Sequence, residues 1–412
     1  MSIKTIVVSA SVIALVACGG TSDIDAPAET TDTVTSETIL TMLIDAKEGD
    51  VIEIPAGTYA FDRGLSLAVD NVTIRGAGMD KTVLSFADQV AGAEGLLVTA
   101  SNFTIEDIAI EDAKGDALKI NEGDTITIRN VRTEWTGGPD TNNGAYGIYP
   151  VQTTNVLIEG SVAIGASDAG IYVGQSQDII VRNNRAEYNV AGIEVENSIR
   201  ADVYDNVAIN NTGGILVFNL AGLTQEGRET RIFQNEVRDN NVDNFAPAGT
   251  IVASVPSGTG IIINANDAVE IFDNQISNNK TANIIVSSLF SSGYSEEDAT
   301  EQAFDPYVET IYIYDNEFAG GGDAPSTAEL AALKLGVFGE DGRMTDVLWD
   351  GFVDLAKQVD GQIPDALKIC VDNGDALVLN ADAPNGYAGP SLYEDANSCT
   401  HEKLPPVDLN RG

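Results

Sequence analysis

The sequence predicts an all-β solenoid, a chain wound into the coils of a parallel β-helix, and two observations lead to this prediction. A glycine followed by alternating aliphatic residues returns at Gly147, Gly170, Gly192 and Gly214, in steps of 23, 22 and 22 residues. Each of these first strands is followed by a second apolar strand and by an Asn- or Asp-rich turn. With a third short strand in stretches such as RAEYN, each repeat completes one coil, which stacks on the next at about 4.8 Å.

Other repeat architectures do not fit this period. It is shorter than ankyrin, tetratricopeptide or WD40 units, it contains no helical periodicity, and it lacks the Leu-x-x-Leu-x-Leu pattern of leucine-rich repeats. The first strands read ALKIN (117–121), GIYPV (147–151), GIYVG (170–174), GIEVE (192–196), GILVF (214–218), GIIIN (260–264) and NIIVS (283–287). The second strands run from TITIRN (125–130) to TIYIYDN (310–316).

The N-terminus is predicted to direct export. Residues 1–17 have a positive start at Lys4 and an apolar run that is too short to span a bilayer, which is typical of a signal peptide. Leu-Val-Ala-Cys at 15–18 is similar to the lipobox of bacterial lipoproteins, which implies cleavage before Cys18 and acylation of its thiol. Gly19 favours the outer membrane, and the alternative is a plain signal peptide with a coincidental cysteine. Residues 18–36 then form a polar, flexible tether.

A short helix is predicted to begin at Ser36 and Glu37, with Ile39, Leu43 and Ile44 on one face, and to plug the open end of the solenoid. The β-helix itself is expected over residues 37–320, as one unit and as a monomer. Residues 321–412 are expected to form a C-terminal cap, with a helix in PSTAELAALKLG and strands in DVLWDGF, DALKICV and DALVLNA.

The remaining cysteines are Cys370 and Cys399, which we expect to pair in an exported protein. Closing a loop of about 30 residues contributes about 3 kcal/mol in the chain-entropy model. The disulfide would therefore hold the cap on the end of the β-helix.

Alternation within a strand predicts which side chains face the interior. Ile171 and Val173 point inward, whereas Tyr172 and Gly174 point outward. We expect asparagines that recur after the second strand to stack as a structural ladder at one turn. These are Asn184, Asn206, Asn235, Asn274 and Asn316.

Composition excludes several functions. The 63 acidic and 22 basic residues give a formal charge of −41, which disfavours nucleic acid and anionic lipid as partners and attracts cations. His401 is the single histidine of the chain, so neither a Ser-His-Asp triad nor a multi-histidine metal site can form. We name no residue as a metal ligand and expect no cofactor, with Ca²⁺ as the open alternative.

The candidate site lies on the outward positions of the first strands. Extra residues near 133–145, 219–228, 241–257 and 288–309 all border these strands, so their loops would flank a groove. One outward column reads Lys119, Tyr149, Tyr172, Glu194, Leu216, Ile262 and Ile285, and its neighbour reads Asn121, Val151, Gly174, Glu196, Phe218, Asn264 and Ser287. The candidate catalytic residues are Tyr172, Tyr149, Lys119 and Glu194. The candidate ligand-binding residues are Asn121, Glu196, Phe218 and Trp135.

Tyrosine beside a carboxylate or lysine suits sugar recognition, by ring stacking and hydrogen bonding. The same groups could abstract a proton next to a uronate carboxyl, with Tyr or Lys as the base. Glu194 and Glu196 face the same way but stand two residues apart on one strand, which makes a weak pair for hydrolysis.

EGDVIEIPAGTYAF (48–61), followed by repeats with GI strands and DN turns, resembles the right-handed parallel β-helix superfamily, which includes pectate lyases and alginate C5-epimerases. The resemblance covers roughly residues 36–320 and implies a right-handed coil with a saccharide site on the first sheet. The chain departs from the epimerase motif Asp-Pro-His-Glu, because Asp305-Pro306 continues with Tyr307, and it lacks Gly-Gly-x-Gly-x-Asp calcium repeats.

DVLWDGF and DALKICV support a narrower likeness to bacterial parallel β-helix lipoproteins of unsettled function, which implies a partner resembling a c-type cytochrome. Three functions follow from the residues and the resemblance. The first is an envelope lipoprotein whose groove binds a polysaccharide or similar extended ligand. The second is a uronate lyase or C5-epimerase, and the third is a non-catalytic scaffold that acts with the cytochrome-like partner.

Overall fold

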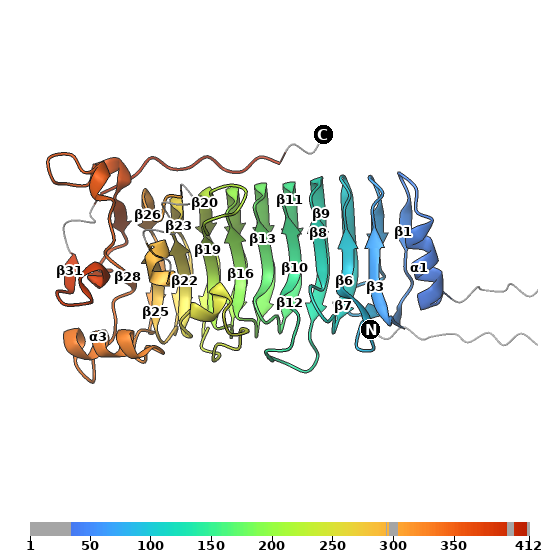
Figure 1. The fold of residues 1–412 in the computed structure, drawn as a ribbon, viewed down its shortest axis with the longest axis horizontal. Coiled ribbons are helices and arrows are strands. Elements are labelled where there is room, and N and C mark those ends of the chain that lie inside the picture. The colour runs from blue at the N-terminus through green and yellow to red at the C-terminus, as the bar shows by residue number, and fades with distance from the viewer. Residues whose placement is uncertain (1–33, 294, 296–303, 394–398, 410–412) are drawn as a thin grey trace, which may run out of the picture. The chain divides into compact units, whose positions relative to one another are not determined.

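A computed structural model describes residues 34–293, 295, 304–393 and 399–409 of the chain. In the described part, residues 34 onward wind into a β-helix whose strands form two sheets (Figure 1). The predicted signal peptide, the lipid-attachment site Cys18 and most of the tether lie outside the described residues. No helix within the described ranges is long and apolar enough to cross a membrane.

The first sheet contains the strands that the sequence predicts to open each coil, and we call it the first row. Its neighbours pair in parallel, except for the last two strands, which pair antiparallel. In order they are β3 (Arg63–Leu67), β6 (Ala91–Val98), β8 (Leu118–Asn121), β10 (Tyr146–Val151), β13 (Ala169–Gly174), β16 (Ala191–Glu196), β19 (Gly213–Phe218), β22 (Thr259–Asn264), β25 (Ala282–Ser287), β28 (Val347–Trp349), β30 (Val378–Asn380) and β31 (Ser391–Tyr393).

The second sheet consists of two rows that share the long strands β7 (Phe103–Glu111) and β9 (Asp124–Glu134). The second row also contains β1 (Val51–Glu53), β4 (Thr73–Arg75), β11 (Thr154–Glu159), β14 (Gln177–Arg182), β17 (Ile199–Tyr204), β20 (Arg228–Phe233), β23 (Asp267–Phe272), β26 (Ile311–Tyr314) and β29 (Ile369–Asp372). The third row also contains β2 (Gly57–Ala60), β5 (Thr82–Ser85), β12 (Val162–Ile164), β15 (Arg185–Glu187), β18 (Val207–Ile209), β21 (Glu236–Arg238), β24 (Gln275–Ser277) and β27 (Glu317–Ala319).

The interior is a continuous stack of aliphatic side chains, as the alternation predicts. Ile171 pairs with Ile193 and Val173 with Val195 in adjacent coils, and all four side chains are buried in one core that follows the axis of the β-helix. This packing removes apolar surface from water along the whole stack, which is the main stabilising contribution in such a solenoid.

The predicted asparagine ladder is confirmed. Asn184 N–H and Nδ2 both donate to Asn206 Oδ1 at 3.0 Å, and the same pattern continues through Asn235, Asn274 and Asn316. A second ladder, which the sequence analysis missed, runs through Asn189, Asn211, Asn240 and Asn279 at another turn. Each ladder satisfies the backbone groups of a buried turn, which would otherwise be costly.

Helix α1 (Ser36–Ile44) covers the first coil as predicted. The Thr35 hydroxyl caps it by accepting from Thr38 N at 3.2 Å, and Ile39 and Leu43 are buried against the core. Ile44, predicted to share that face, is instead 71% exposed because the helix ends there and the chain turns away at Asp45.

The stack of parallel strands continues beyond residue 320, the predicted start of the cap. β28 extends the first row, and β29 extends the second row beside β26. The predicted helix is present as α3 (Ala328–Phe338), capped by Thr327, whose hydroxyl accepts from Leu330 N at 3.3 Å. Short 3₁₀ turns fill the loops: η1 (Ile251–Ser254), η2 (Leu289–Ser292), η3 (Leu355–Lys357), η4 (Asp365–Leu367) and η5 (Ala383–Asn385).

The predicted disulfide is also present, and it joins Cys370 of β29 to Cys399. Beyond it, the C-terminal residues run back along the outside of the coils (Figure 1). Leu404 N donates to Glu270 Oε1 at 3.0 Å and Val407 N donates to Asp202 Oδ2 at 3.1 Å, so this tail is held on the second row.

Candidate functional site

The outer face of the first row carries the predicted residues in the predicted register. Lys119 pairs with Tyr149, Tyr172 with Glu194, and Glu194 with Leu216 in neighbouring strands. The second outward column is aligned in the same way from Asn121 through Glu196 to Ser287. The face divides into two parts. Its N-terminal half, over β8 to β16, carries a polar cluster, and its C-terminal half, over β19 to β28, carries a pocket.

The polar cluster is built around three tyrosines. The ring of Tyr146 lies 4.4 Å from that of Tyr149 and 4.6 Å from that of Tyr172, measured between centroids, and the Tyr149 and Tyr172 rings meet edge to face at 4.9 Å. Lys119 Nζ lies 4.8 Å from the Tyr149 ring centroid and 3.3 Å from Asp116 Oδ2. The lysine is therefore paired with a carboxylate and stacked on a ring.

Carboxylates complete the cluster. Tyr172 Oη donates to Glu196 Oε1 at 2.5 Å, and its ring lies over Gly174, where a Cβ would come within 2.4 Å of the tyrosine. Glu194 is 3% exposed, and its Oε2 has no hydrogen-bond partner among the described residues. The predicted outward slots are thus directed away from the core, yet Tyr172 and Glu194 are closed off from solvent by their neighbours.

This environment raises the pKa values of the carboxyl and phenol groups in the cluster and so favours their protonated forms. Burial raises the pKa of Glu194 well above its ordinary value, and the Asp168 and Glu196 carboxylates add to the effect. The pKa of Asp168 rises to about 7, mainly by burial and then by repulsion from Glu196. Burial and nearby carboxylates also raise the pKa of Tyr149 to about 12 and that of Tyr172 well above its usual range. The tyrosines are therefore hydrogen-bond donors rather than bases at neutral pH.

Two members of the cluster were missed from the sequence. Tyr146 has the same parity as the inward Ile148, but it packs with the outer-face cluster beside Ala169. Asp168 precedes its strand, and it meets the cluster only because the chain turns there. The pair Tyr146-Gly147 at the strand start is the signal that could have been used, because a bulky residue stands where the three following coils have Ala169, Ala191 and Gly213.

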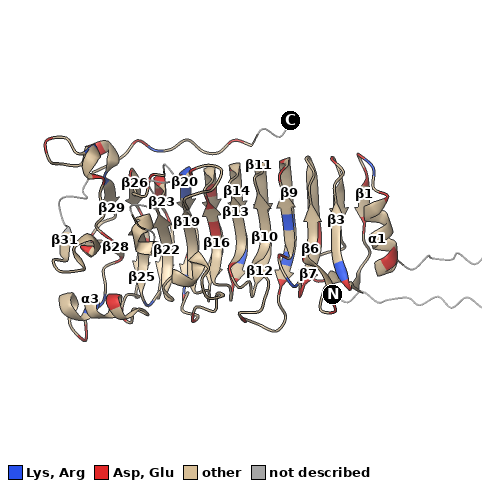
Figure 2. Cartoon of the chain, in the orientation of Figure 1, with Lys and Arg blue, Asp and Glu red and all other residues tan. Residues whose placement is uncertain are grey.

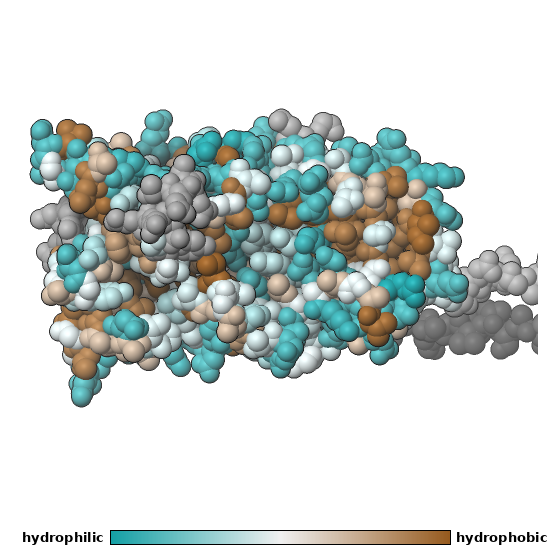
Figure 3. Space-filling view, viewed as in Figure 1, coloured by the Kyte–Doolittle hydropathy of each residue, from teal (hydrophilic) through white to brown (hydrophobic). Residues whose placement is uncertain are grey.

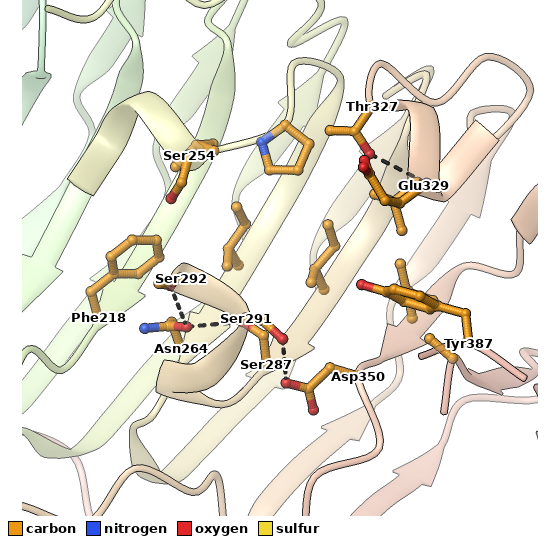
Figure 4. A pocket seen from close by; sticks show the side chains of 17 residues that line it. Phe218, Ser254, Asn264, Ser287, Ser291, Ser292, Thr327, Glu329, Asp350 and Tyr387 are labelled. Carbon is orange, nitrogen blue, oxygen red and sulfur yellow. Dashed lines mark hydrogen bonds between the residues drawn. The ribbon is translucent and has the colours of Figure 1, made fainter. Parts of the chain in front are cut away.

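The pocket has a volume of about 300 Å³ and an apolar floor (Figure 4). Phe218 of β19, Ile262 of β22, Ile285 of β25 and Leu348 of β28 line it. Figure 4 shows Ser254 and Thr327 on one side and Ser291 and Asp350 on the other. Figure 3 shows hydrophobic side chains in a hollow toward the C-terminal end of this face.

Polar groups around the pocket are held in fixed directions. Asn264, which is fully buried, accepts from the hydroxyls of Ser287 and Ser292 through Oδ1, each at 3.1 Å. Asp350 Oδ2 accepts from Ser288 N, Ser288 Oγ and Ser291 Oγ at 2.7, 2.8 and 2.7 Å. Asn264 Nδ2 has no partner in the described part of the chain. This nitrogen is closed off from solvent, so a ligand in the pocket would reach it only if neighbouring side chains moved.

The structure separates the predicted ligand-binding residues. Phe218 lines the pocket and pairs in register with Glu196 of the polar cluster, so it joins the two halves of the face. Asn121 lies at the end of β8, away from the pocket lining. Trp135 does not flank a groove: it is 5% exposed, packs in the interior core, and donates from Nε1 to Ala113 O at 2.7 Å. It fills the corner of its coil, so its assignment to the ligand site is corrected.

A possible cation site lies elsewhere, at the start of β23. Oxygens of Asp267, Asp305 and Glu309 lie within 4.8 Å of one another and could hold a metal ion such as Ca²⁺, which prefers carboxylate oxygens. Lys357 Nζ, however, donates to Asp305 Oδ2 and Glu309 Oε2, both at 2.7 Å. An ammonium group thus already neutralises two of the three carboxylates, and a cation would have to displace it.

Comparisons with solved structures find several similar chains. The chain is similar to the A-modules of two mannuronan C-5 epimerases from Azotobacter vinelandii. The first is 17% identical, and the alignment covers 79% of this chain and 86% of that chain with a TM-score of 0.45. The second is 18% identical, and the alignment covers 79% of this chain and 84% of that chain with a TM-score of 0.47. This chain is also similar to DFA-IIIase from Arthrobacter chlorophenolicus A6, at 13% identity, with 76% and 89% covered and a TM-score of 0.47.

A search of curated proteins finds no match. The model of the right-handed β-helix region matches residues 66–229 and 141–296, which together span more than half of the chain. With its stacked coils and three rows of parallel strands, the chain belongs to the right-handed β-helix family.

Proposed function

We propose that the outer face of the first row binds a saccharide, and that the pocket over β19 to β28 is the principal subsite. One observation carries the proposal: a pocket with an apolar and aromatic floor is bordered by serine and threonine side chains that can hydrogen-bond to a sugar. Ligand pockets in proteins commonly have this composition and begin at about 300 Å³.

The apolar part of the pocket suits a sugar ring. A pyranose presents C–H groups on one face, and aromatic side chains pack on such faces while burying apolar area. Phe218 lies at one end of the pocket, and Tyr387, which is 39% exposed, lies at the other (Figure 4). Ile262 and Ile285 form the surface between them.

The polar part suits sugar hydroxyls. Because the Oδ1 atom of Asn264 is occupied by two serine hydroxyls, its amide nitrogen is the group left to donate. A buried donor without a partner costs about 1–3 kcal/mol, and a ligand oxygen would offset this cost only if the side chains that cover the nitrogen moved aside. Ser254 and Thr327 add hydroxyls along one side of the pocket.

Binding without turnover is favoured over uronate lyase or epimerase chemistry. Those reactions need a base for the proton next to the carboxyl group, and a base of pKa near the working pH is the most effective. The pKa of Tyr149 is raised to about 12, mainly by burial, and Lys119 is held by Asp116. Asp168 has a pKa of about 7, but it lies outside the pocket lining, where the sugar is proposed to bind. Glu194 is closed off beneath the tyrosines. The polar cluster is thus suited to orienting Phe218 and the edge of the pocket.

Tyr387 offers a clean test because the chain contains a matched control. Tyr387→Ala should weaken binding of oligosaccharides by about tenfold, the effect of one lost aromatic contact. Tyr188→Ala is the control, since Tyr188 is 42% exposed, lies outside the pocket, and shares the left-handed backbone, with φ of 60° against 61°. Both variants should melt alike.

The measurement is isothermal titration calorimetry against a panel of neutral and acidic oligosaccharides. Equal binding by wild type and Tyr387→Ala, with a responding ligand in hand, would overturn the pocket assignment. A panel in which nothing binds the wild-type protein would overturn the proposed function itself.

We further propose that the protein is anchored in the cell envelope through an acylated Cys18, which would present the face to envelope or extracellular glycans. The support is the lipobox-like run at 15–18 and the polar stretch that follows. Cys18→Ser should move the protein from the membrane to the soluble fraction of the native host. Unchanged fractionation would contradict the anchor while leaving the saccharide site untouched.

A further inference from the structure

We infer, on the basis of the proposed function, that the pocket selects an uncharged sugar and discriminates against uronates. The charged side chains that line the pocket, Glu329 and Asp350, are both carboxylates. A uronate would bring a third carboxylate to this surface, whereas a neutral hexose or pentose would bring hydroxyls that both accept and donate.

The two carboxylates stand at different depths. Asp350 is buried, and its Oδ2 atom is saturated by three donors, while Phe352 N donates to Oδ1 at 3.2 Å. Glu329 is exposed in the first turn of α3, at the mouth of the pocket (Figure 4). An arriving ligand therefore meets an accessible negative charge at the rim, whereas burial raises the pKa of the Asp350 carboxyl group at the floor and disfavours its charged form.

The rest of the face adds carboxyl groups but little charge. Glu196 pairs in register with Phe218, and Glu194 lies beside it in the outward column. Burial raises the pKa of both carboxyl groups and disfavours their charged forms. The discrimination against uronates therefore rests on the exposed carboxylate of Glu329 at the rim of the pocket.

The described residues that line the pocket include no lysine or arginine. In the described strands of the first row, Lys and Arg occur at Arg63 and Lys119, both in the N-terminal part (Figure 2). Arg63 pairs with Asp62 and Lys119 with Asp116. In the segments that frame the pocket, Arg343 donates to Asp346 at 2.9 and 3.1 Å. The described part of the pocket lining therefore offers no side chain that would neutralise a uronate.

The experiment uses pairs of oligosaccharides that differ in one group. Mannan and mannuronan, galactan and galacturonan, and glucan and glucuronan oligomers of equal length exchange a hydroxymethyl for a carboxylate. Affinities are measured by calorimetry with EDTA present, so that no divalent cation can bridge a uronate to Glu329. We expect at least one neutral oligomer to bind about tenfold or more tightly than its acidic counterpart, and we expect the ratio to fall as salt is raised.

A rim variant makes the test specific. Glu329→Lys should improve binding of the acidic member of the pair and reduce the ratio severalfold, while Glu329→Gln should reduce it less. Glu340→Lys, also in the segment around α3 but outside the pocket lining, is the control for net charge.

The outcomes are distinguishable. If an acidic oligomer binds as well as or better than its neutral counterpart in EDTA, this inference is overturned and the saccharide site stands. If neither series binds wild type, the proposed function fails and the inference fails with it. If the ratio is unchanged in Glu329→Lys, the rim carboxylate is not the source of selectivity.

Discussion

The outer faces of the first and second rows are built from the same coils, but they differ in how their polar groups are satisfied. On the second row, one outward column runs through every coil as Glu53, Arg75, Glu106, Arg129, Glu159, Arg182, Tyr204, Phe233, Phe272 and Tyr314. On the first row, the corresponding column changes from Lys119 through tyrosines and Glu194 to aliphatic residues.

The second-row column is an uninterrupted ladder. Its charges alternate, and each central arginine bridges two glutamates, as Arg129 does with Glu106 at 3.2 Å and Glu159 at 2.7 Å. Arg182 then donates to Tyr204 Oη at 3.0 Å, and the rings of Tyr204 and Phe233 stack at 4.7 Å. Neighbouring coils satisfy these side chains, and we therefore assign this column a structural role.

The first-row face has no such uniform column over its described strands. Buried groups without a hydrogen-bond partner among the described residues occur on both faces, at Glu194 Oε2 and Asn264 Nδ2 on the first row and at Asp202 Oδ1 and Arg231 Nε on the second. The first row differs in that its column changes character and the pocket opens beside Phe218. Matched columns in repeated coils stabilise the solenoid, and we propose that the column that breaks the match is where a ligand acts. Three experiments test this contrast.

The largest effect is expected from Phe233→Ala on the second row. Phe233 lies between Tyr204 and Phe272, with centroids at 4.7 and 4.8 Å, so its removal interrupts the aromatic ladder. We expect the free energy of unfolding to fall by about 2 kcal/mol, less than for a fully buried phenylalanine. Urea unfolding measures this change, and saccharide binding should stay as in wild type. Lost binding at unchanged stability would reverse the roles of the two faces.

A smaller effect is expected from pH. A carboxyl group on the first row should make stability fall as the pH rises, whereas one on the second row should make it fall as the pH falls. Glu194 has a raised pKa in the folded state. Its contribution to folding stability is therefore complete below the ordinary pKa of 4.5 and is lost as the pH rises from 4.5 through the folded-state pKa. Burial alone would raise the pKa of Glu159 as well, but hydrogen bonds from Arg129 and Arg182 lower it overall. Its contribution is therefore present above 4.5 and is lost as the pH falls through the folded-state value.

Glutamine variants test the two opposite pH dependences of stability separately. In a series of thermal melts from about pH 3 to about pH 8, Glu194→Gln should remove part of the decline in stability toward high pH. Glu159→Gln should remove part of the decline toward low pH. The same pH profile in both variants would show that the two carboxyl groups do not differ in the way that the geometry indicates.

The smallest effect is expected from Arg129→Gln. Arg129 is 42% exposed at its side chain, and solvent screens its two ion pairs, so the loss of stability should be about 0.5–1 kcal/mol. The loss should largely disappear in about 1 M salt, where the screening length is about 3 Å. A larger loss that persists in salt would mean that the side chain contributes by packing instead.

Much of the fold could be predicted because the coil is a local and repeated unit. The period places the first strands, and alternation places Ile193 and Val195 in the core, since a one-residue slip would expose every apolar side chain of the strand. The asparagine ladder and the disulfide follow from recurrence at one turn and from the pairing of two thiols in an exported chain.

The sequence by itself therefore determined the solenoid, its register and the residues on the outer face where we propose the site. Only the tertiary structure decided how that face is built. Tyr172 folds flat over Gly174, Tyr146 turns outward, Trp135 enters the core, and Tyr387 and Asp350 reach the pocket from more than 100 residues beyond Phe218. Alternation fixes the side of the sheet on which a residue emerges, but the loops that pack on that side come from distant segments. Their contacts depend on the shape of the whole stack, and a repeat of 22 residues carries no information about them.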